Sequence, residues 1–386
     1  MYIHLPHSLP HYFRRRFSKQ LEALYLSVAM TDFALAAVVL FEPIYLYQLG
    51  FSLSHLMMYY IVVYGLYFFL VPMGGKFVAR FGTGRSFILA SIMLMGYYGS
   101  LWLVRGHPIF FWVAPVFFAL QKMWYWPAYH SDFIQSSDQG ERGKEFSGLW
   151  SLSTMAYIVG PLVGGLLIKF SGFPALFTFV GILVILANVP LLMAKTHIQP
   201  EKFSYWHALR APFARVHIKS TLGYVGLGEE LVMMVLWPVF IYLTFRDYLS
   251  IGWAVSIATL VTALFTLYIG QRVDKGKQYQ TLRRGAVLTS LVWLTRTIVR
   301  GIPTVFVSDT VGRVVKNSTF VPMTSITYER ALREGQVVER SVFFEQGFAI
   351  GKSLTAAGVI LVLHFFASWN AIWLLTAVVS VLYLLF

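Results

Sequence analysis

Four acidic side chains stand inside long apolar stretches of the sequence, where a charge is costly. Asp32 lies in the first such stretch, and the adjacent Glu229 and Glu230 lie at a similar depth in the seventh. Glu345 lies in the eleventh. Carboxylates shielded from water can bind and release protons near neutral pH. We therefore predict proton binding at these residues. Only one of Glu229 and Glu230 is expected to face a cavity, because neighbours on a helix lie about 100° apart.

A second group combines acids and bases on one helical face. Asp309, Arg313 and Lys316 follow one another at spacings of four and three, with Asn317 adjacent. Lys122 lies in the fourth apolar stretch. A cluster with more cations than anions can attract an anionic substrate or neutralise carboxylates across a cavity. The simpler alternative is a static ion pair between Asp309 and Arg313.

Aromatic residues occur at the same depth as these charges. Trp124, Tyr125 and Trp237 are predicted to line a substrate cavity, and packing in the core or against lipid is the alternative for each. Glu42, near the outer end of the first stretch, is either a gate or a hydrated residue. His130, at the end of the fourth stretch, is either a proton exit or a helix cap.

Membrane-spanning helices are needed to position these residues. The 386-residue chain is 57% hydrophobic and 12% charged, with a mean hydropathy of +0.65, and lacks the polar residues to cover a soluble protein of this size. About 20 apolar residues span a bilayer as a helix. Twelve such stretches are predicted, near 21–46, 53–74, 86–104, 108–130, 147–169, 173–194, 220–244, 249–270, 284–301, 303–326, 341–365 and 368–386.

The net charge of +14 reflects topology rather than nucleic-acid binding. Most of the 31 Lys and Arg residues lie in the N-terminal arm and in alternate loops, and few lie in the opposite loops. Cytoplasmic loops are enriched in Lys and Arg, so both termini are predicted to be cytoplasmic in a multi-pass protein of the plasma membrane. The sequence has no Cys and no His-rich or acidic metal-binding pattern, so neither a cofactor nor a metal is expected.

The two halves of the sequence repeat each other. Pro43 pairs with Pro238 and Pro127 with Pro322, in each case 195 positions later. Internal symmetry in an apolar chain is typical of secondary transporters. Between the halves, Trp206 and other aromatic residues alternate with basic ones, which predicts a short helix lying on the membrane. The predicted domains are an N-terminal arm (1–19), a six-helix bundle (20–194), a cytoplasmic linker (195–219) and a second six-helix bundle (220–386).

Two loops carry a motif that resembles a known family. Gly75-Lys-Phe-Val-Ala-Arg80-Phe-Gly82 and its repeat Gly270-Gln-Arg-Val-Asp274-Lys275-Gly276 resemble the loop motif of the major facilitator superfamily. In that family an Asp and an Arg of the motif brace neighbouring helix ends. Ala79 stands at the Asp position of the first copy, whereas the second copy keeps Asp274, so an asymmetric brace is expected. The gating-loop residues implied by the resemblance are Gly75, Arg80, Gly82, Gly270, Asp274 and Lys275.

A further segment is similar to a motif of drug/proton antiporters within the superfamily. It reads Gly160-Pro161-Leu-Val-Gly164-Gly165 and lies in the fifth apolar stretch. Gly and Pro in a membrane helix usually serve close packing or a kink, which is the structural alternative for Gly160, Pro161, Gly164 and Gly165.

The resemblance implies an all-α membrane protein with twelve helices in two pseudo-symmetric bundles, of which helices 1, 4, 7 and 10 line a central cavity. It implies a secondary active transporter without enzymatic activity, which moves a small-molecule substrate across the lipid bilayer by alternating access. Protons are the expected coupling ion, and export is favoured by the Gly-Pro motif. Import or exchange of an organic anion, and a transport-inactive sensor, are the alternatives.

Overall fold

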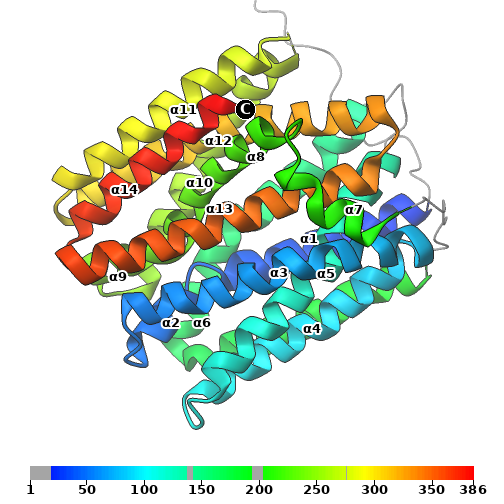
Figure 1. Ribbon diagram of the computed structural model, residues 1–386. Helices are drawn as coiled ribbons and strands as arrows, with labels where there is room; N and C mark the ends of the chain where they lie inside the picture. Colours follow the sequence, from blue (N-terminus) through cyan, green and yellow to red (C-terminus); the bar gives the residue numbers. More distant parts are fainter. Residues whose placement is uncertain (1–18, 137–141, 194–202, 275) are drawn as a thin grey trace, which may run out of the picture.

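The computed structural model describes residues 19–136, 142–193, 203–274 and 276–386, and these residues form helices and short connections without a β-strand (Figure 1). The apolar stretches of the first half form five long helices and one short one. Their bounds are α1 (Lys19–Val38), α2 (Glu42–Gln48), α3 (Leu53–Phe81), α4 (Thr83–Val104), α5 (Phe110–Ser136) and α6 (Arg142–Met193).

The second half is built in the same way after a short helix, α7, in the connection. The remaining elements are α7 (Tyr205–Arg210), η1 (Ala211–Phe213), α8 (Ile218–Val225), η2 (Gly226–Gly228), α9 (Glu229–Phe245), α10 (Tyr248–Asp274), α11 (Gln278–Thr295), η3 (Arg296–Ile298), α12 (Gly301–Glu334), α13 (Val337–Phe366), α14 (Trp369–Val381) and η4 (Leu382–Leu385).

Besides α7 and η1, the described residues form twelve helical segments when interrupted helices are grouped. The first consists of α1 and α2, and the seventh of α8, η2 and α9. α6 contains the fifth and sixth, because Gly172 adopts φ 79° and breaks the helix between them. Within the described residues, seven helical stretches are long and apolar enough to cross a membrane on length and composition alone, and the bent Ser153–Pro190 is one of them. The chain is an all-α membrane protein with the fold of two six-helix bundles.

Two helix pairs join the bundles. α3 packs along α13, and α6 packs along α10, as Figure 1 shows for α3 and α13. Within the first bundle α1 packs against α6 and α4 against α5, whereas α11 packs against α12 and α14 in the second. We call the end of the bundles that carries α7 the inner end and the end that carries α2 the outer end.

Glycines on α6 permit the close approach of two neighbouring helices. A Cβ atom on Gly160 or Gly164 would overlap the α1 backbone at Ala36 and Ala37, and one on Gly165 would lie 2.6 Å from the Tyr248 carbonyl oxygen of α10. The neighbouring Pro161 lies at the same contact, where its carbonyl faces Gly252. The glycines of the Gly-Pro motif therefore allow close packing of helices, which was the structural alternative for this motif.

Substituting one of these glycines provides a test of the packing. Gly164→Ala is expected to lower the free energy of unfolding by about 1–3 kcal/mol, because the added methyl group forces α1 and α6 apart. The change is measured as a lower thermal midpoint of the purified protein in detergent. Gly181→Ala on the same helix is the matched control, because its Cβ would meet nothing within 4 Å. Equal midpoints for the two variants would contradict the close contact.

The connection between the bundles exposes large apolar side chains. Trp206 and Phe213 are 65% and 66% exposed beside the basic residues Arg210 and Arg215. α7 contacts the inner ends of α3 and α13, and the Tyr205 hydroxyl donates to the Phe69 carbonyl at 3.2 Å. An apolar face flanked by basic residues suits the membrane interface. The exact domain boundaries at 195–219 stay a prediction, because residues 194–202 lie outside the described part of the chain.

Candidate functional site

A buried carboxylate connects the two bundles in their inner half. Glu345 of α13 is 3% exposed, and its Oε2 accepts a hydrogen bond from the Tyr67 hydroxyl of α3 at 3.0 Å. Its Oε1 lies 2.9 Å from Nε2 of His130 on α5, whose Nδ1 lies 2.6 Å from the Tyr328 hydroxyl of α12. Because α3 and α5 belong to the first bundle and α12 and α13 to the second, these contacts hold the bundles together.

Lys352 extends the connection two turns further along α13. Its Nζ donates to the Tyr64 hydroxyl of α3 at 3.0 Å and lies 3.8 Å from the centre of the Phe348 ring. Oε1 of Glu230 on α9 lies 3.9 Å from the same ammonium group. Glu345 and Lys352 thus share a face of α13, as their spacing predicts, but each contacts groups on other helices.

Lys316 of α12 binds both adjacent acids of α9. Its Nζ lies 2.6 Å from Glu229 and 3.6 Å from Glu230. Glu229 also accepts hydrogen bonds from Trp293 at 2.9 Å and Tyr383 at 3.0 Å, so it points into the second bundle. Glu230 points toward α13 and Lys352, and the two side chains diverge as neighbours on a helix must.

Asp309 and Arg313 form the static pair that was the simpler alternative. Arg313 Nε donates to Asp309 Oδ2 at 2.8 Å, and Trp237 Nε1 donates to Oδ1 at 2.9 Å. Trp237 is fully buried and stacks with other aromatic rings, so the expectation that it lines a cavity is replaced by a role in packing. The Asn317 amide donates to Thr266 at 2.6 Å and therefore faces α10 rather than the charged cluster.

Lys122 and its aromatic neighbours on α5 face different surroundings. The Lys122 ammonium is buried and lies 4.4 Å from the centre of the Phe118 ring. Trp124 packs edge-on against Phe77 at 4.5 Å, in the inner half of the first bundle. Tyr125 lines a small pocket instead of the space between the bundles.

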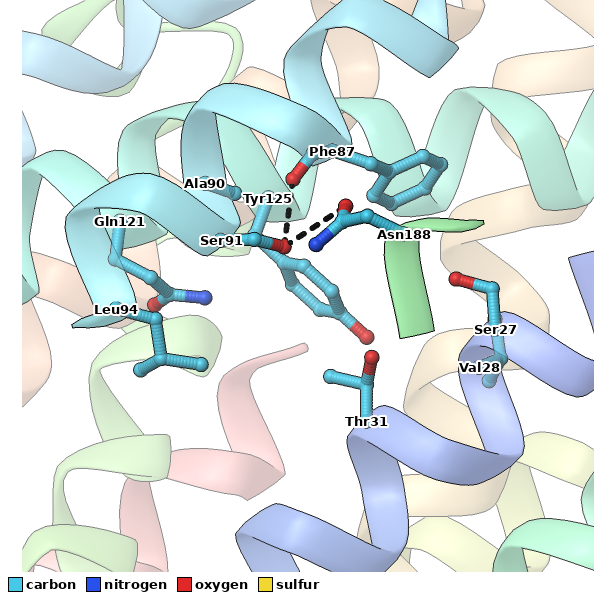
Figure 2. Close-up of a pocket in the computed structure, with 10 residues that line it drawn as sticks. All are labelled: Ser27, Val28, Thr31, Phe87, Ala90, Ser91, Leu94, Gln121, Tyr125 and Asn188. Atoms are coloured by element: carbon cyan, nitrogen blue, oxygen red, sulfur yellow. Dashed lines mark hydrogen bonds between the residues drawn. The ribbon is translucent and has the colours of Figure 1, made fainter. Parts of the chain in front are cut away.

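The pocket beside Tyr125 lies wholly within the first bundle (Figure 2). Ser91 donates to the Phe87 carbonyl at 3.0 Å and to the Asn188 side-chain oxygen at 3.1 Å, which ties α4 to α6. The lining contains no charged side chain and consists of Ser27, Val28, Thr31, Phe87, Ala90, Ser91, Leu94, Gln121, Tyr125 and Asn188. It offers neutral hydrogen-bonding groups to water or to a small polar molecule.

Asp32 lies apart from the contacts of Glu345 and from those of Lys316. It is half-buried on α1 and accepts a hydrogen bond from the Ser153 hydroxyl of α6. Both residues lie in the first bundle, and among the described residues no cation pairs with Asp32.

Two further charged residues are buried: Glu42, which was expected near the outer end, and Arg296, which no sequence-based expectation covered. Glu42 is not hydrated: it is 3% exposed and accepts hydrogen bonds from Tyr97 at 2.9 Å and Tyr98 at 2.8 Å, and its role as a gate stays a prediction. Arg296 was missed, although an arginine in the ninth apolar stretch is a visible signal. Its guanidinium lies between the rings of Trp237 and Trp293, at 3.8 and 3.9 Å from their centres.

The gating-loop residues of the first copy lie at the inner end. Arg80 is exposed, with its guanidinium 5.2 Å from the centre of the Phe81 ring. Gly75 faces Val342 of α13, and a Cβ there would lie 2.6 Å from that side chain. Gly82, at φ 83°, separates α3 from α4. In the second copy Gly270 has open space around it, and the side chains of Asp274 and Lys275 lie outside the described residues. The asymmetric brace therefore stays a prediction.

The bundles also meet at the outer end. The Gln48 amide of α2 donates to the Tyr242 hydroxyl of α9 and accepts a hydrogen bond from the Tyr248 hydroxyl of α10. With the Glu345 contacts in the inner half, polar contacts between bundles therefore occur on both sides of the central charges.

Known structures share this architecture. An auto-inhibited peptide transporter of the POT family superposes with a TM-score of 0.75 at 12% identity, with 95% of this chain and 96% of that chain covered. A mutant of the nucleoside transporter NupG gives 0.71 at 14% identity (94% and 97% covered), and a D-xylose-proton symporter gives 0.67 at 14% identity (94% and 95% covered). A search of curated proteins gave no significant match. The family model described as Major Facilitator Superfamily matches residues 24–227, more than half of the sequence, and the chain therefore belongs to the Major Facilitator Superfamily.

Proposed function

We propose that this chain is a proton-coupled secondary transporter that moves a small solute by alternating access. The observation that carries the proposal is the position of Glu345, a buried titratable carboxylate at the interface of the two bundles. Alternating access requires that one end of the interface opens while the other closes. A proton that binds at this interface can bias that choice.

The chemistry of the contacts explains the coupling. Hydrogen bonds to a charged carboxylate are stronger than those to a neutral group. The charged form of Glu345 therefore favours the contacts with Tyr67 and His130. A proton on Glu345 removes that charge and weakens the contacts, so protonation favours opening of the inner end. The neighbouring titratable groups are His130, Tyr67 and Tyr328, and they are the groups through which a proton can pass.

The motif at 160–165, on which export was favoured, packs against α1 and α10, and such packing serves import and export equally. Organic-anion import or exchange gains support from Lys122, a buried cation. A transport-inactive sensor would keep the fold but would move neither solute nor protons.

Proteoliposomes loaded with a pH-sensitive dye test the proposal. Solutes are added one at a time to vesicles containing the full chain. Proton movement through the protein is recorded in vesicles that have no other pathway for protons. A coupled transporter moves protons when its solute is present and accumulates that solute when a pH gradient is imposed. A solute that binds the protein but moves no protons would contradict proton coupling. A chain that moves no solute would be a sensor.

Asp32 is proposed as a second proton-binding residue. Its carboxylate has a neutral hydrogen-bond donor, Ser153, and can therefore be protonated without breaking an ion pair among the described residues. Asp32→Asn is expected to lower the gradient-driven accumulation several-fold while substrate binding persists. Asp247→Asn, an exposed acid at the outer end, is the matched control and should behave as the parent. Equal accumulation by both variants would assign Asp32 a structural role.

A further inference from the structure

Lys122 is a buried cation that takes part in none of the ion pairs described for the central helices. Its side chain on α5 is 7% exposed, and among the described residues no acid lies within ion-pair distance of it. The buried acids of the region are each bound by other donors. Glu345 contacts His130 and Tyr67, and Glu42 accepts hydrogen bonds from Tyr97 and Tyr98. Glu229 binds Lys316, Trp293 and Tyr383, and Glu230 lies near Lys316 and Lys352. Asp309 binds Arg313 and Trp237.

The surroundings of Lys122 are aromatic. Its Nζ lies 4.4 Å from the centre of the Phe118 ring, 5.6 Å from that of Tyr64 and 5.8 Å from that of Trp126. Lys352 of α13 approaches the same Tyr64 ring, with its Nζ 4.8 Å from the ring centre. Two ammonium groups, one from each bundle, thus lie around one tyrosine. In the described part of the chain Lys352 has only Glu230 as an acid partner, at 3.9 Å, and Glu230 is shared with Lys316.

A buried charge without a counter-charge is costly, and aromatic rings compensate it only in part. An incoming anion would supply the missing charge and would form charge-assisted hydrogen bonds with the ammonium groups. The aromatic side chains around Lys122 would contact the apolar body of the same molecule. Arg313 and Lys316, the other cations considered for this role, are already paired with Asp309 and Glu229.

We propose that Lys122 and Lys352 together bind the anionic group of the transported solute, which is a small organic carboxylate or phosphate with an aromatic or apolar body. The site lies between the bundles, because Lys122 belongs to α5 and Lys352 to α13. Binding of the anion therefore draws the two bundles together over the substrate. This inference rests on the proposed transport function and adds the substrate class to it.

Thermal-shift titrations of the purified full chain in detergent test the proposal. The anionic probes are phenylacetate, indole-3-acetate and phenyl phosphate, so that the carboxylate and phosphate arms are separate. Their neutral counterparts are phenylacetamide, indole-3-acetamide and phenol, and the cationic ones are phenethylamine and tryptamine. We expect at least one anion to stabilise the parent protein, and its neutral and cationic counterparts to do so at least tenfold more weakly.

Substitutions of Lys122 show whether the ammonium group is responsible. Lys122→Met is expected to weaken anion binding about 10- to 100-fold, as the loss of one charge-assisted hydrogen bond does, and Lys122→Arg should retain part of it. The ligand-free Lys122→Met protein should be at least as stable as the parent, because an unpaired buried charge is removed. Lys169→Met, an exposed lysine near the outer end, is the matched control and should bind as the parent.

Three outcomes would overturn the inference: stabilisation by none of the anions, equal stabilisation by their neutral or cationic counterparts, or unchanged anion binding in Lys122→Met. The proposed transport function has a separate test. If an amine moves protons in proteoliposomes and binds Lys122→Met as it binds the parent, the substrate class is wrong and proton-coupled transport stands. If an anion binds through Lys122 but moves no protons, the substrate site stands and the coupling is wrong.

Discussion

Glu345→Gln is expected to abolish accumulation of solute driven by a pH gradient, while exchange of solute across the membrane continues. Glutamine keeps the size of the side chain and its ability to accept a hydrogen bond from Tyr67, but it cannot bind or release a proton. If Glu345 carries the coupling proton, the variant resembles the permanently protonated protein. The measurement is the steady-state ratio of solute inside and outside proteoliposomes at an imposed pH gradient, which should fall to the ratio without a gradient.

The control for this prediction lies on the same helix. Glu339 is at the beginning of α13, and its Oε1 lies 3.0 Å from Nε2 of the exposed His207 of α7. Glu339→Gln should leave gradient-driven accumulation unchanged. If Glu345→Gln accumulates solute as the parent does, the coupling proton binds elsewhere, and Asp32 or Glu230 becomes the leading candidate.

Lys316→Met is expected to destabilise the protein more than any other substitution considered. It leaves Glu229 buried without its cation and removes the nearer of the two described cations that lie within 4 Å of Glu230. Breaking a buried ion pair by removing one partner costs about 3–5 kcal/mol, because the remaining charge is uncompensated. Purified Lys316→Met should show a thermal midpoint many degrees below that of the parent, or fail to accumulate in the membrane.

A second substitution distinguishes charge from packing in this cluster. Lys316→Met combined with Glu229→Gln removes both charges of the closest pair, so it should recover a large part of the lost stability. Lys277→Met, an exposed lysine that precedes α11, should have no effect. If the double variant is as unstable as Lys316→Met alone, the ammonium group acts through packing rather than through its charge.

The helices were largely predictable from the sequence, because long apolar stretches have few alternatives to helix in a membrane. What the sequence did not reveal is where helices break or continue. The first segment is interrupted after Val38, and the seventh passes through a short 3₁₀ turn at Gly226–Gly228. The second interruption lies at a close contact between helices, where a Cβ on Gly228 would meet Thr355 and the Gly351 backbone of α13.

The site was predictable only where its contacts are local. The pair Asp309 and Arg313 is separated by one helical turn, so their spacing alone placed them together. Glu345 and His130 are 215 positions apart, and Glu42 and Tyr97 are 55 apart, so no spacing rule connects them. Such pairs arise when helices from distant parts of the chain pack. The same reason explains why Trp237 was expected at a cavity and is found in a packed aromatic cluster.

The central claim is that the charge on Glu345 holds the bundles together in their inner half. It is tested most directly by measuring the distance between spin labels at Arg80→Cys and Lys277→Cys, exposed sites at the inner ends of α3 and α11, since the native chain has no cysteine. Glu345→Gln is expected to shift the distances toward longer values, because a neutral amide forms weaker contacts with Tyr67 and His130 than a carboxylate does. Identical distance distributions for Glu345→Gln and the parent would contradict the account.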